Sequence, residues 1–455
     1  MAEAMGGASR PPAAPPIPGG RTTGPRSGSH SQPATEAGER HTVPPPRDRG
    51  EQGDRGGPPG EPPEPLAGIR VLDLSRLVAG GMLGMQLGDF GAEVVKVEQP
   101  GRGDPLRTWT VEGRALWWRV YGRNKRTITL NVAGPDGRAL LRRLVPRFDV
   151  LLESFVPGTL ERWGLAPATL HEWHPGLAIA RISAWGQDGP YRDRPGFGTL
   201  VEAASGFAAM TGDPDRPPVL PPLPLADMVA ALYGVNAVMY ALYARDVRGV
   251  GGQVIDLALF DGLFSILGPL ADEYRLTGRT RTREGSRSRN AAPRGVYPTK
   301  DGAWIAVSAS TPPMTERFLR GYGLGHLLDD PRFATNQLRV LHGEELDELV
   351  AAQFAARTLA ENLELIERER LTAIAVQTIA DIEADPHWRA RELTAGYADD
   401  QGTVRMHHVV PRLDRTPGAI RWGGRPIGAD NEAVYRGELG LSEREFEALQ
   451  QAGVI

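Results

Sequence analysis

The sequence predicts an α/β protein in which a Rossmann-like, open parallel sheet forms a large domain and a smaller α+β domain follows it. Three observations carry this prediction. Short β-branched runs alternate with helical segments through the first half of the chain. A helix after the first run has bare backbone along one face, which favours close packing on a sheet. Asp301-Gly302, between two apolar runs, is a strong hairpin signal and marks a change of pattern.

The alternation begins with a strand–helix–strand unit. Residues 66–75 form a short apolar run bounded by Gly68, and residues 92–98 form a second one. Between them Gly80, Gly84 and Gly88 recur every four residues, so they share one helix face. Two strands joined by a helix pair in parallel, which makes this unit the start of a parallel sheet.

The same patterns predict the later elements. Strands are expected at 127–131, 148–153 and 177–183, and a helix at 135–144. Apolar segments predict helices at 225–245 and 256–270. The hairpin spans 296–308, helices fill 313–372, a strand-like stretch lies near 404–413 and a polar helix covers 442–452.

These elements divide the chain into five parts. Residues 1–66 are rich in Gly and Pro, and we expect a disordered extension because its only large apolar residues are Met1, Met5, Ile17, Val43 and Leu66. The large domain is expected at 67–275, an Arg-rich linker at 276–295 and the small domain at 296–395. The segment 396–455 is expected to return to the large domain.

Composition excludes several classes of protein. The chain has no Cys, which removes disulfide scaffolds, thiolate nucleophiles and cysteine-ligated metals. Its net charge of −4 does not fit a nucleic-acid partner, since phosphate contacts require a basic face. No run of about 20 apolar residues predicts a membrane span. We therefore expect a cytoplasmic protein.

Three kinds of catalytic motif are also absent. Glu98 follows a glycine-rich turn as in dinucleotide-binding units, but residues 77–84 lack the Gly-x-Gly-x-x-Gly fingerprint. The pair His171 and His174 does not have the spacing of a zinc-binding helix, and no metal site is predicted. The string Ala203-Ala-Ser-Gly206 does not match the Gly-x-Ser-x-Gly of serine hydrolases.

A glycine-rich stretch followed by an acid is the remaining candidate site. Glycines recur between Gly186 and Gly212, which lets backbone approach a ligand closely. Asp227 then stands at the start of an almost wholly apolar helix. A carboxylate there is either a helix cap or a nucleophile that attacks an activated acyl carbon, and residue patterns alone leave both interpretations open.

The order of segments resembles the class III CoA-transferase family, which includes formyl-CoA transferase and carnitine CoA-transferase and is related to alpha-methylacyl-CoA racemase. The resemblance spans 66–455. It rests on a set of strings in order, each weak alone: Gly68-Ile-Arg-Val-Leu-Asp-Leu-Ser75, Gly91-Ala-Glu-Val-Val-Lys-Val-Glu98, Gly103-Asp104, Asn124-Lys-Arg126, Glu153-Ser-Phe-Val-Pro-Gly158, Arg162-Trp-Gly164, Gly186-Gln-Asp-Gly-Pro190, Asp227, Asp330-Pro-Arg-Phe333 and Glu438-Leu-Gly-Leu441.

This resemblance implies a function and a set of site residues. It implies transfer of CoA between carboxylic acids through an aspartyl-CoA thioester, with Asp227 as nucleophile. Coenzyme A thioesters and small carboxylic acids are then substrates, with no permanently bound cofactor, and the chain is expected to form an interlocked homodimer. The implied CoA contacts are Arg76, Leu77, Val78, Ala79, Gln99, Leu130, Ser154, Phe155, Val156, Arg162 and Trp163.

Departures from the family pattern leave two alternatives. The family's racemases carry Gly-His-Asp where this chain has Gly196-Phe-Gly198, so a two-base racemase lacks its imidazole. Some transferases carry a glutamate near this point, and Gly198 supplies none. Glu202, one helical turn further on, is the candidate to replace it as a second catalytic acid. A racemase and a non-catalytic CoA-binding protein remain the alternatives, and the sequence does not name the acyl group.

Overall fold

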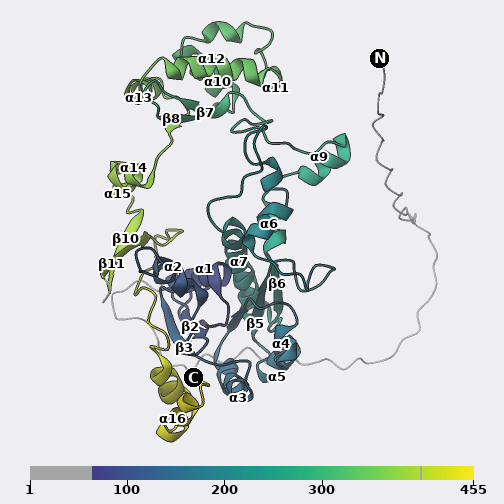
Figure 1. Cartoon of the computed structure of the whole chain (residues 1–455), viewed down its shortest axis with the longest axis vertical. Coiled ribbons are helices and arrows are strands. Elements are labelled where there is room, and N and C mark those ends of the chain that lie inside the picture. Colours follow the sequence, from purple (N-terminus) through teal and green to yellow (C-terminus); the bar gives the residue numbers. More distant parts are fainter. Residues whose placement is uncertain (1–63, 400–401) are drawn as a thin grey trace, which may run out of the picture. The chain divides into compact units, whose positions relative to one another are not determined.

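The computed structural model describes residues 64–399 and 402–455, so the expected extension lies outside the described residues except for its last three positions. A six-stranded sheet is its centre (Figure 1). The strands are β1 (Arg70–Asp73), β2 (Glu93–Glu98), β3 (Lys125–Thr129), β4 (Val150–Glu153), β5 (Ala178–Ser183) and β6 (Val254–Ala258). The predicted α/β class with an open parallel sheet is confirmed.

The order of the strands creates a reversal in the middle of the sheet. The order is β3-β2-β1-β4-β5-β6, and each neighbouring pair is parallel. From β1 the chain moves outward through β2 to β3, whereas from β4 it moves to the opposite edge. Ligands of such sheets bind outside the carboxyl ends of the two strands at the reversal, which here are β1 and β4.

Helices cover both faces of this sheet. One core cluster joins the sheet to α1 (Leu77–Asp89), α6 (Gly198–Ala204), α7 (Leu225–Arg248) and α8 (Leu259–Ser265). The other joins it to α3 (Pro135–Leu144), α4 (Thr159–Arg162), α5 (Pro167–Trp173) and the C-terminal segment. Both faces of the inner strands are therefore buried, as is usual for parallel sheets.

Glycines let the first of these layers pack closely, as the sequence predicts for α1. A Cβ at Gly84 would lie 3.0 Å from Asp73 Oδ2 and from Lys125 Nζ, and a Cβ at Gly80 would collide with the Ser75 side chain. Gly234 has the same role in α7, where a Cβ would lie 2.3 Å from Leu83 Cδ1. The helix α1 therefore packs with its backbone directly against side chains of the sheet, and α7 packs in the same way against α1.

A second, smaller sheet follows. Its strands β7 (Arg294–Pro298), β8 (Trp304–Ser308) and β9 (Ala373–Ala375) pair antiparallel, and the β7–β8 pairing confirms the predicted hairpin around Asp301-Gly302. A separate apolar cluster packs it against helices. The helices between the large sheet and β9 are α9 (Leu270–Thr277), α10 (Pro312–Gly321), α11 (Asn336–Leu341), α12 (Gly343–Ala355) and α13 (Leu359–Arg368).

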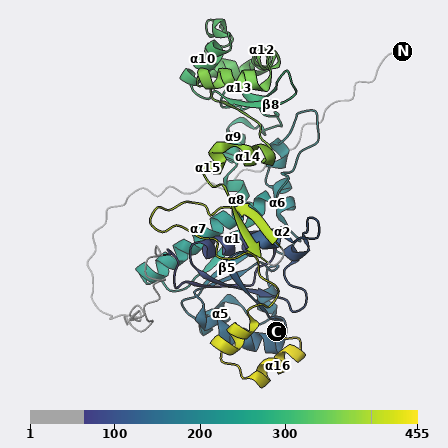
Figure 2. The same cartoon turned by 90° about the vertical axis from the view of Figure 1, so that its left-hand side faces the viewer.

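The C-terminal segment contacts the large sheet again. After α14 (Ile379–Ala384) and α15 (Pro386–Ala390), the hairpin β10 (Thr394–Asp399) and β11 (Gly402–His407) contacts α2 (Leu116–Tyr121) through an Arg119–Asp399 ion pair (Figure 2). The predicted polar helix is α16 (Glu443–Gln451), and Ser442 caps it with a capping box. Tyr435 donates to the Thr129 carbonyl (2.8 Å), which attaches this segment to β3.

One predicted element is wrong. Residues 256–270 were expected to be helical, but β6 occupies 254–258 and the helix α8 begins only at Leu259. β6 is an edge strand whose first three residues are not buried, so its short pattern lacks the apolar run of the inner strands. α7 is also longer than expected, and by length and composition it would be able to cross a membrane. In this fold one side of it packs on α1, α6 and α8.

Gly234→Ala tests the close packing of α7. Alanine is favoured over glycine inside a helix by about 1 kcal/mol, but the added Cβ would lie 2.3 Å from Leu83 Cδ1 and 2.8 Å from Leu257 Cδ2. Overpacking of this kind costs about 1–3 kcal/mol, so we expect a lower thermal unfolding midpoint. Gly262→Ala in α8 is the control, because its Cβ meets nothing closer than 3.5 Å. Equal midpoints for the two variants would contradict the packing argument.

Candidate active site

The two turns at the reversal of the sheet lie side by side. Arg76 and Leu77 follow β1, and residues 154–156 follow β4. The Arg76 backbone N–H donates to Ser154 Oγ at 2.9 Å, which joins one turn to the other. The sequence therefore brings these two predicted CoA-binding segments together at the place where the topology predicts a ligand.

A network of buried ion pairs stabilises the turn that follows β1. Lys125 Nζ donates to Asp73 Oδ2 (2.8 Å), and Lys96 lies 3.1 Å from Asp104 Oδ2. Burial alone would raise the pKa of Asp73, but Lys125 and Lys96 lower it. Asp104 Oδ1 in turn accepts the Leu77 N–H (3.3 Å), where Leu77 has a left-handed backbone with φ of +62°. This ion-pair network keeps an unusual backbone conformation at the start of α1.

Asp227 lies in the first turn of α7 and points at the start of α1. The backbone N–H groups of Ala79 and of Asp227 itself lie close enough to this carboxylate to lower its pKa. The first turns of α1 and α7 are thus both close to this carboxylate, and helix N-termini favour negative charge. The side chain is only partly buried, so it remains accessible to a ligand.

The first residue of α6 leaves room for this carboxylate only because it is glycine. A Cβ at Gly198 would lie 2.1 Å from Asp227 Oδ2, which is far inside van der Waals contact. By the family resemblance, Gly198 lies near the point where some transferases carry a glutamate. In the fold the Asp227 carboxylate itself occupies the space that a side chain at 198 would need.

Glu202 lies four residues further along α6 and is only 2% exposed. Its Oε1 accepts the backbone N–H of Ala226 at 3.1 Å, so it fixes the first turn of α7 next to Asp227. Glu202 does not line the cavity described below. Its contact is therefore with the protein backbone that carries Asp227.

Burial and charge change the acidity of Asp227. Desolvation, followed by the negative charge of Glu202, raises the pKa of Asp227 to about 6, while the two backbone N–H donors oppose this rise. The group is therefore mostly ionised at neutral pH and protonated below about pH 6. A carboxylate with a raised pKa in a cleft is a candidate for chemistry, and as a stronger base it is a better nucleophile than a solvated aspartate.

A cavity of about 150 Å³ opens in front of Asp227. Of the predicted site residues, it is lined by Arg76, Leu77, Ala79, Ser154, Phe155, Val156 and Asp227. A second, more open hollow lies beside Glu383, Arg389 and Arg405. We do not regard that hollow as the site, because no predicted site residue lines it and its Arg405 is paired with Glu383 (2.8 Å).

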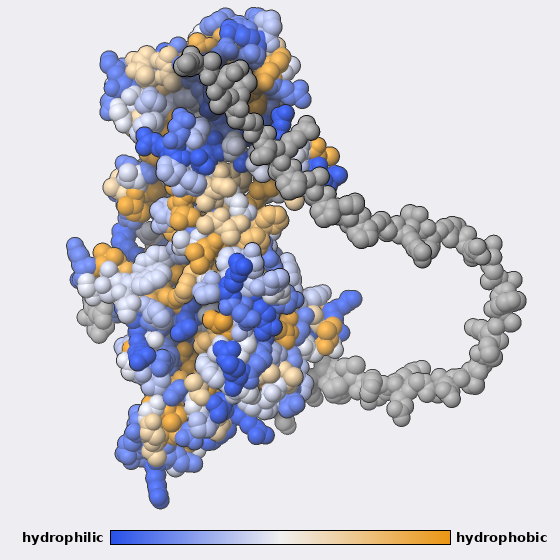
Figure 3. Space-filling view, turned by 45° about the vertical axis from the view of Figure 1, so that its right-hand side comes forward, coloured by the Kyte–Doolittle hydropathy of each residue, from blue (hydrophilic) through white to orange (hydrophobic). Residues whose placement is uncertain are grey.

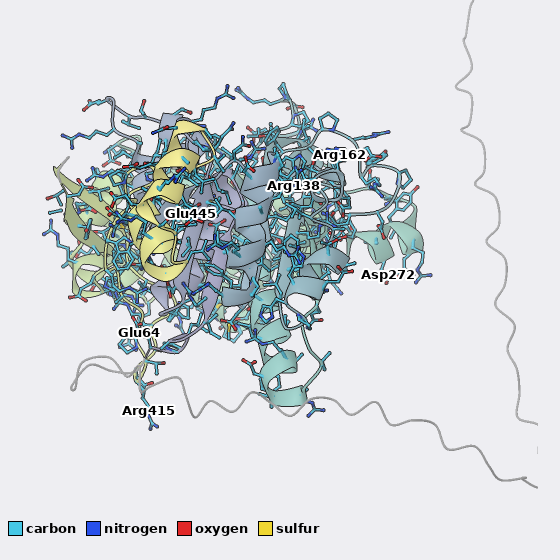
Figure 4. The ribbon with its side chains drawn as sticks, turned by 90° about the horizontal axis from the view of Figure 1, so that it is seen from below. Glu64, Arg138, Arg162, Asp272, Arg415 and Glu445 are labelled. Carbon is cyan, nitrogen blue, oxygen red and sulfur yellow. The ribbon has the colours of Figure 1, made fainter. Side chains whose placement is uncertain are left out.

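Five predicted CoA contacts lie outside this cavity. Val78 and Leu130 are buried in the core, and Gln99 is exposed. Trp163 packs edge-on against Phe155 with ring centroids 5.1 Å apart, so it supports a cavity residue. Arg162 donates to Thr159 Oγ1 and lies at the periphery of the molecule in the view from below (Figure 4). The role of all five in binding CoA stays a prediction.

Several lining residues were missed from the sequence. Trp185, Arg192, Arg194 and Leu259 complete the wall together with Pro157, Ile182, Ser183, Ala184, Gly196 and Phe197. Six of them lie on the loop between β5 and α6, two before the motif Gly186–Pro190 and four after it. Arg192 and Arg194 in this glycine-rich loop were the signal in the sequence that pointed to these lining residues. They were given no role because no family motif includes them.

Comparisons with known proteins match most of the chain. The family model named CoA-transferase family III matches residues 66–431. The chain is 42% identical over 398 residues to succinyl-CoA–D-citramalate CoA-transferase of Chloroflexus aurantiacus, covering 87% of this chain and 99% of that protein. It is 31% identical over 405 residues to human succinyl-CoA:glutarate CoA-transferase, covering 86% and 90%. A CAIB/BAIF family protein of Brucella suis superimposes with a TM-score of 0.71 at 33% identity, covering 82% of this chain and 99% of that one.

Glu202→Gln tests the electrostatic coupling in this site. Glutamine keeps an oxygen that accepts the Ala226 N–H but removes the negative charge beside Asp227. We expect the pKa of Asp227 to fall below about 6. It is measured from the pH dependence of the aspartate carboxyl carbon signals by NMR. Glu172→Gln, on the exposed side of α5, is the control and leaves that pKa unchanged. An unaltered or higher value in Glu202→Gln would contradict the coupling.

Proposed function

The chain belongs to CoA-transferase family III and is an acyl-CoA:carboxylate CoA-transferase, and we propose that Asp227 is the nucleophile of its reaction. The observation that carries the proposal is the position of the Asp227 carboxylate. It faces a cavity at the reversal of the sheet, and its pKa of about 6 leaves it ionised at neutral pH. Membership of the family makes CoA thioesters and carboxylic acids the substrates.

The first half of the reaction forms a CoA adduct of the protein. The Asp227 carboxylate attacks the carbonyl carbon of the acyl-CoA, the carbon–sulfur bond breaks, and a mixed anhydride and CoA thiolate result. The thiolate then attacks the Asp227 carbonyl carbon. An Asp227-CoA thioester forms, and the donor acid leaves as its carboxylate.

The second half repeats these steps in reverse with the acceptor acid. Its carboxylate attacks the Asp227-CoA thioester and releases the thiolate, which then attacks the acceptor's carbonyl carbon in the new anhydride. The products are a new acyl-CoA and the regenerated Asp227 carboxylate. No step consumes water, so the free energy of the thioester is retained, and a cavity partly closed to solvent favours this outcome.

The backbone around Asp227 supports this chemistry. The Ala79 N–H, which lowers the pKa of the resting carboxylate, would also stabilise negative charge that develops on the Asp227 oxygen when the Asp227 carbonyl carbon is attacked. We propose that Glu202 is a positioning residue, because it contacts the Ala226 N–H and not the cavity. Gly198 is then important because it has no side chain that would collide with the Asp227 carboxylate. The absence of an acid at this position is therefore no argument for a non-catalytic protein.

We propose acids with a second carboxylate as substrates. The relatives in Chloroflexus aurantiacus and human are named for succinyl-CoA with citramalate or glutarate, and each of these acids has a second carboxylate. The cavity supports this choice by its charge. Three arginines and one acid line it, so it favours an anionic ligand.

Asp227→Ala tests the central role of this residue. We expect kcat to fall by at least about a thousandfold, as when covalent nucleophiles are removed, while the Kd for CoA measured by calorimetry stays unchanged. Asp261→Ala is a matched control. Asp261 occupies the third position of α8 as Asp227 does in α7, but it lies outside the cavity. Retained transfer in Asp227→Ala would exclude Asp227 as the nucleophile.

We propose that the protein is a cytoplasmic homodimer. Large apolar side chains of α7 are exposed, among them Tyr240 (72%) and Tyr243 (60%), and hydrophobic residues are visible on the surface around mid-height in Figure 3. Such an apolar surface fits a second copy of the chain, as the family resemblance implies.

Sedimentation velocity is expected to give a dimer, and Tyr240→Glu with Tyr243→Glu is expected to shift it toward monomer. Leu341→Glu, also at an exposed apolar position, is the control and stays dimeric. A native protein that sediments as a monomer at micromolar concentration would exclude the dimer.

A further inference from the structure

Positive charge surrounds the Asp227 cavity on the side of the β5–α6 loop. Arg76, Arg192 and Arg194 line the cavity, whereas Asp227 is its only acid in the described part of the chain. With Asp227 ionised, this wall retains an excess of positive charge. A neutral acyl chain gives these guanidinium groups nothing to bind, so the charge points to an anionic group on a ligand.

Arg194 is held in place by aromatic rings. Its guanidinium carbon lies 3.6 Å from the centroid of the Tyr191 ring. Tyr191 meets Trp185 edge-on at 5.9 Å, and Trp185 lies 6.1 Å from Phe260 at the start of α8. The Trp185 Nε1–H also donates to the Pro195 carbonyl (3.3 Å), which fixes the loop next to Arg194. This arrangement orients the guanidinium before a ligand binds.

Arg194 keeps its hydrogen-bond donors available. Among residues 64–399 and 402–455, no carboxylate forms an ion pair with it. A guanidinium that stacks by its face on a ring presents its N–H groups at the edge, and two of them match the two oxygens of a carboxylate. The stacking on Tyr191 therefore favours binding of a planar anion in the cavity.

Arg192 lies in a different environment. A Cβ built on Gly158 would be 3.7 Å from Arg192 Nη2 and 3.3 Å from Arg162 Nη1, so both guanidinium groups lie beside the turn after β4. Arg192 also pairs with Asp193 at 3.4 Å. The pair Arg162 and Arg192 is suited to phosphate groups of CoA beside the β4 turn, which leaves Arg194 for a second anionic group.

We propose that Arg194 binds the second carboxylate of a dicarboxylic substrate while the reacting carboxyl group lies at Asp227. This inference rests on the proposed function, and it names the residue that selects the substrate class. An acid without a second carboxylate leaves the oriented guanidinium without a carboxylate partner. Such a substrate loses a charge-assisted, bidentate interaction.

The experiment compares two acids with the same carbon chain. Succinate and butyrate serve as acceptors from propionyl-CoA, a donor without a second carboxylate, and kcat/KM is measured for each with the native chain, Arg194→Gln and Arg194→Lys. Arg216→Gln is the control, because Arg216 has a side chain 79% exposed and does not line the cavity. KM for the acyl-CoA donor is measured in the same series.

The native chain and Arg216→Gln are expected to prefer succinate, and Arg194→Gln is expected to reduce this preference at least about tenfold. Arg194→Lys, which keeps the charge but not the planar fork, falls between them. The expected loss comes with an unchanged KM for the donor and unchanged use of butyrate.

Three results would overturn the inference. The first is a preference for succinate that survives in Arg194→Gln, and the second is a native chain without any preference. The third is an Arg194→Gln variant that loses both acids equally with a raised KM for the donor, which would assign Arg194 to a CoA phosphate. In all three the native chain still transfers CoA. Failure of the native chain with every acid would instead refute the proposed function, and this inference with it.

Discussion

The site depends on the close approach of backbone segments that only glycine permits. Gly84 lets α1 descend onto Asp73 and Lys125 of the sheet, and Gly234 lets α7 descend onto Leu83 of α1. Gly198 then lets α6 meet the Asp227 carboxylate directly. Because each contact is closer than a Cβ would allow, the position of Asp227 relative to the strand ends is fixed by sterics and not by a flexible side chain.

Electrostatics then determines what this fixed carboxylate does. Burial and Glu202 make it more basic, while the Ala79 N–H stabilises its charge. These effects oppose each other, and the result is a group that is ionised at neutral pH but less stabilised than in water. The buried network of Asp73, Lys96, Asp104 and Lys125 serves the same end, because it maintains the turn from which the Ala79 N–H points. The segment after β1 thus both lines the cavity and places a backbone N–H near Asp227.

Local patterns in the sequence predict secondary-structure elements, whereas the contacts within the site depend on the fold. The α3 helix matches its predicted bounds, since Pro135 starts it and amphipathic spacing continues it. β6 was missed because an edge strand containing Asp256 lacks an apolar run. Asp227 was predicted from its place at the start of an apolar helix and from a family motif, but the effect of Gly198 depends on the distance between α6 and the Asp227 carboxylate. Arg194 lies in the glycine-rich stretch of the candidate site but was given no role, because its stacking on Tyr191 is a contact that the sequence does not show.

The most direct test of the account is a search for CoA bound to the protein. The native chain is incubated with succinyl-CoA without an acceptor acid, quenched, digested and analysed by mass spectrometry, with and without hydroxylamine. We predict CoA on the peptide that contains Asp227, and an Asp227 hydroxamate after hydroxylamine treatment. Turnover with the adduct on Glu202, or turnover with no adduct at all, would contradict the assignment of Asp227 as the residue that carries CoA.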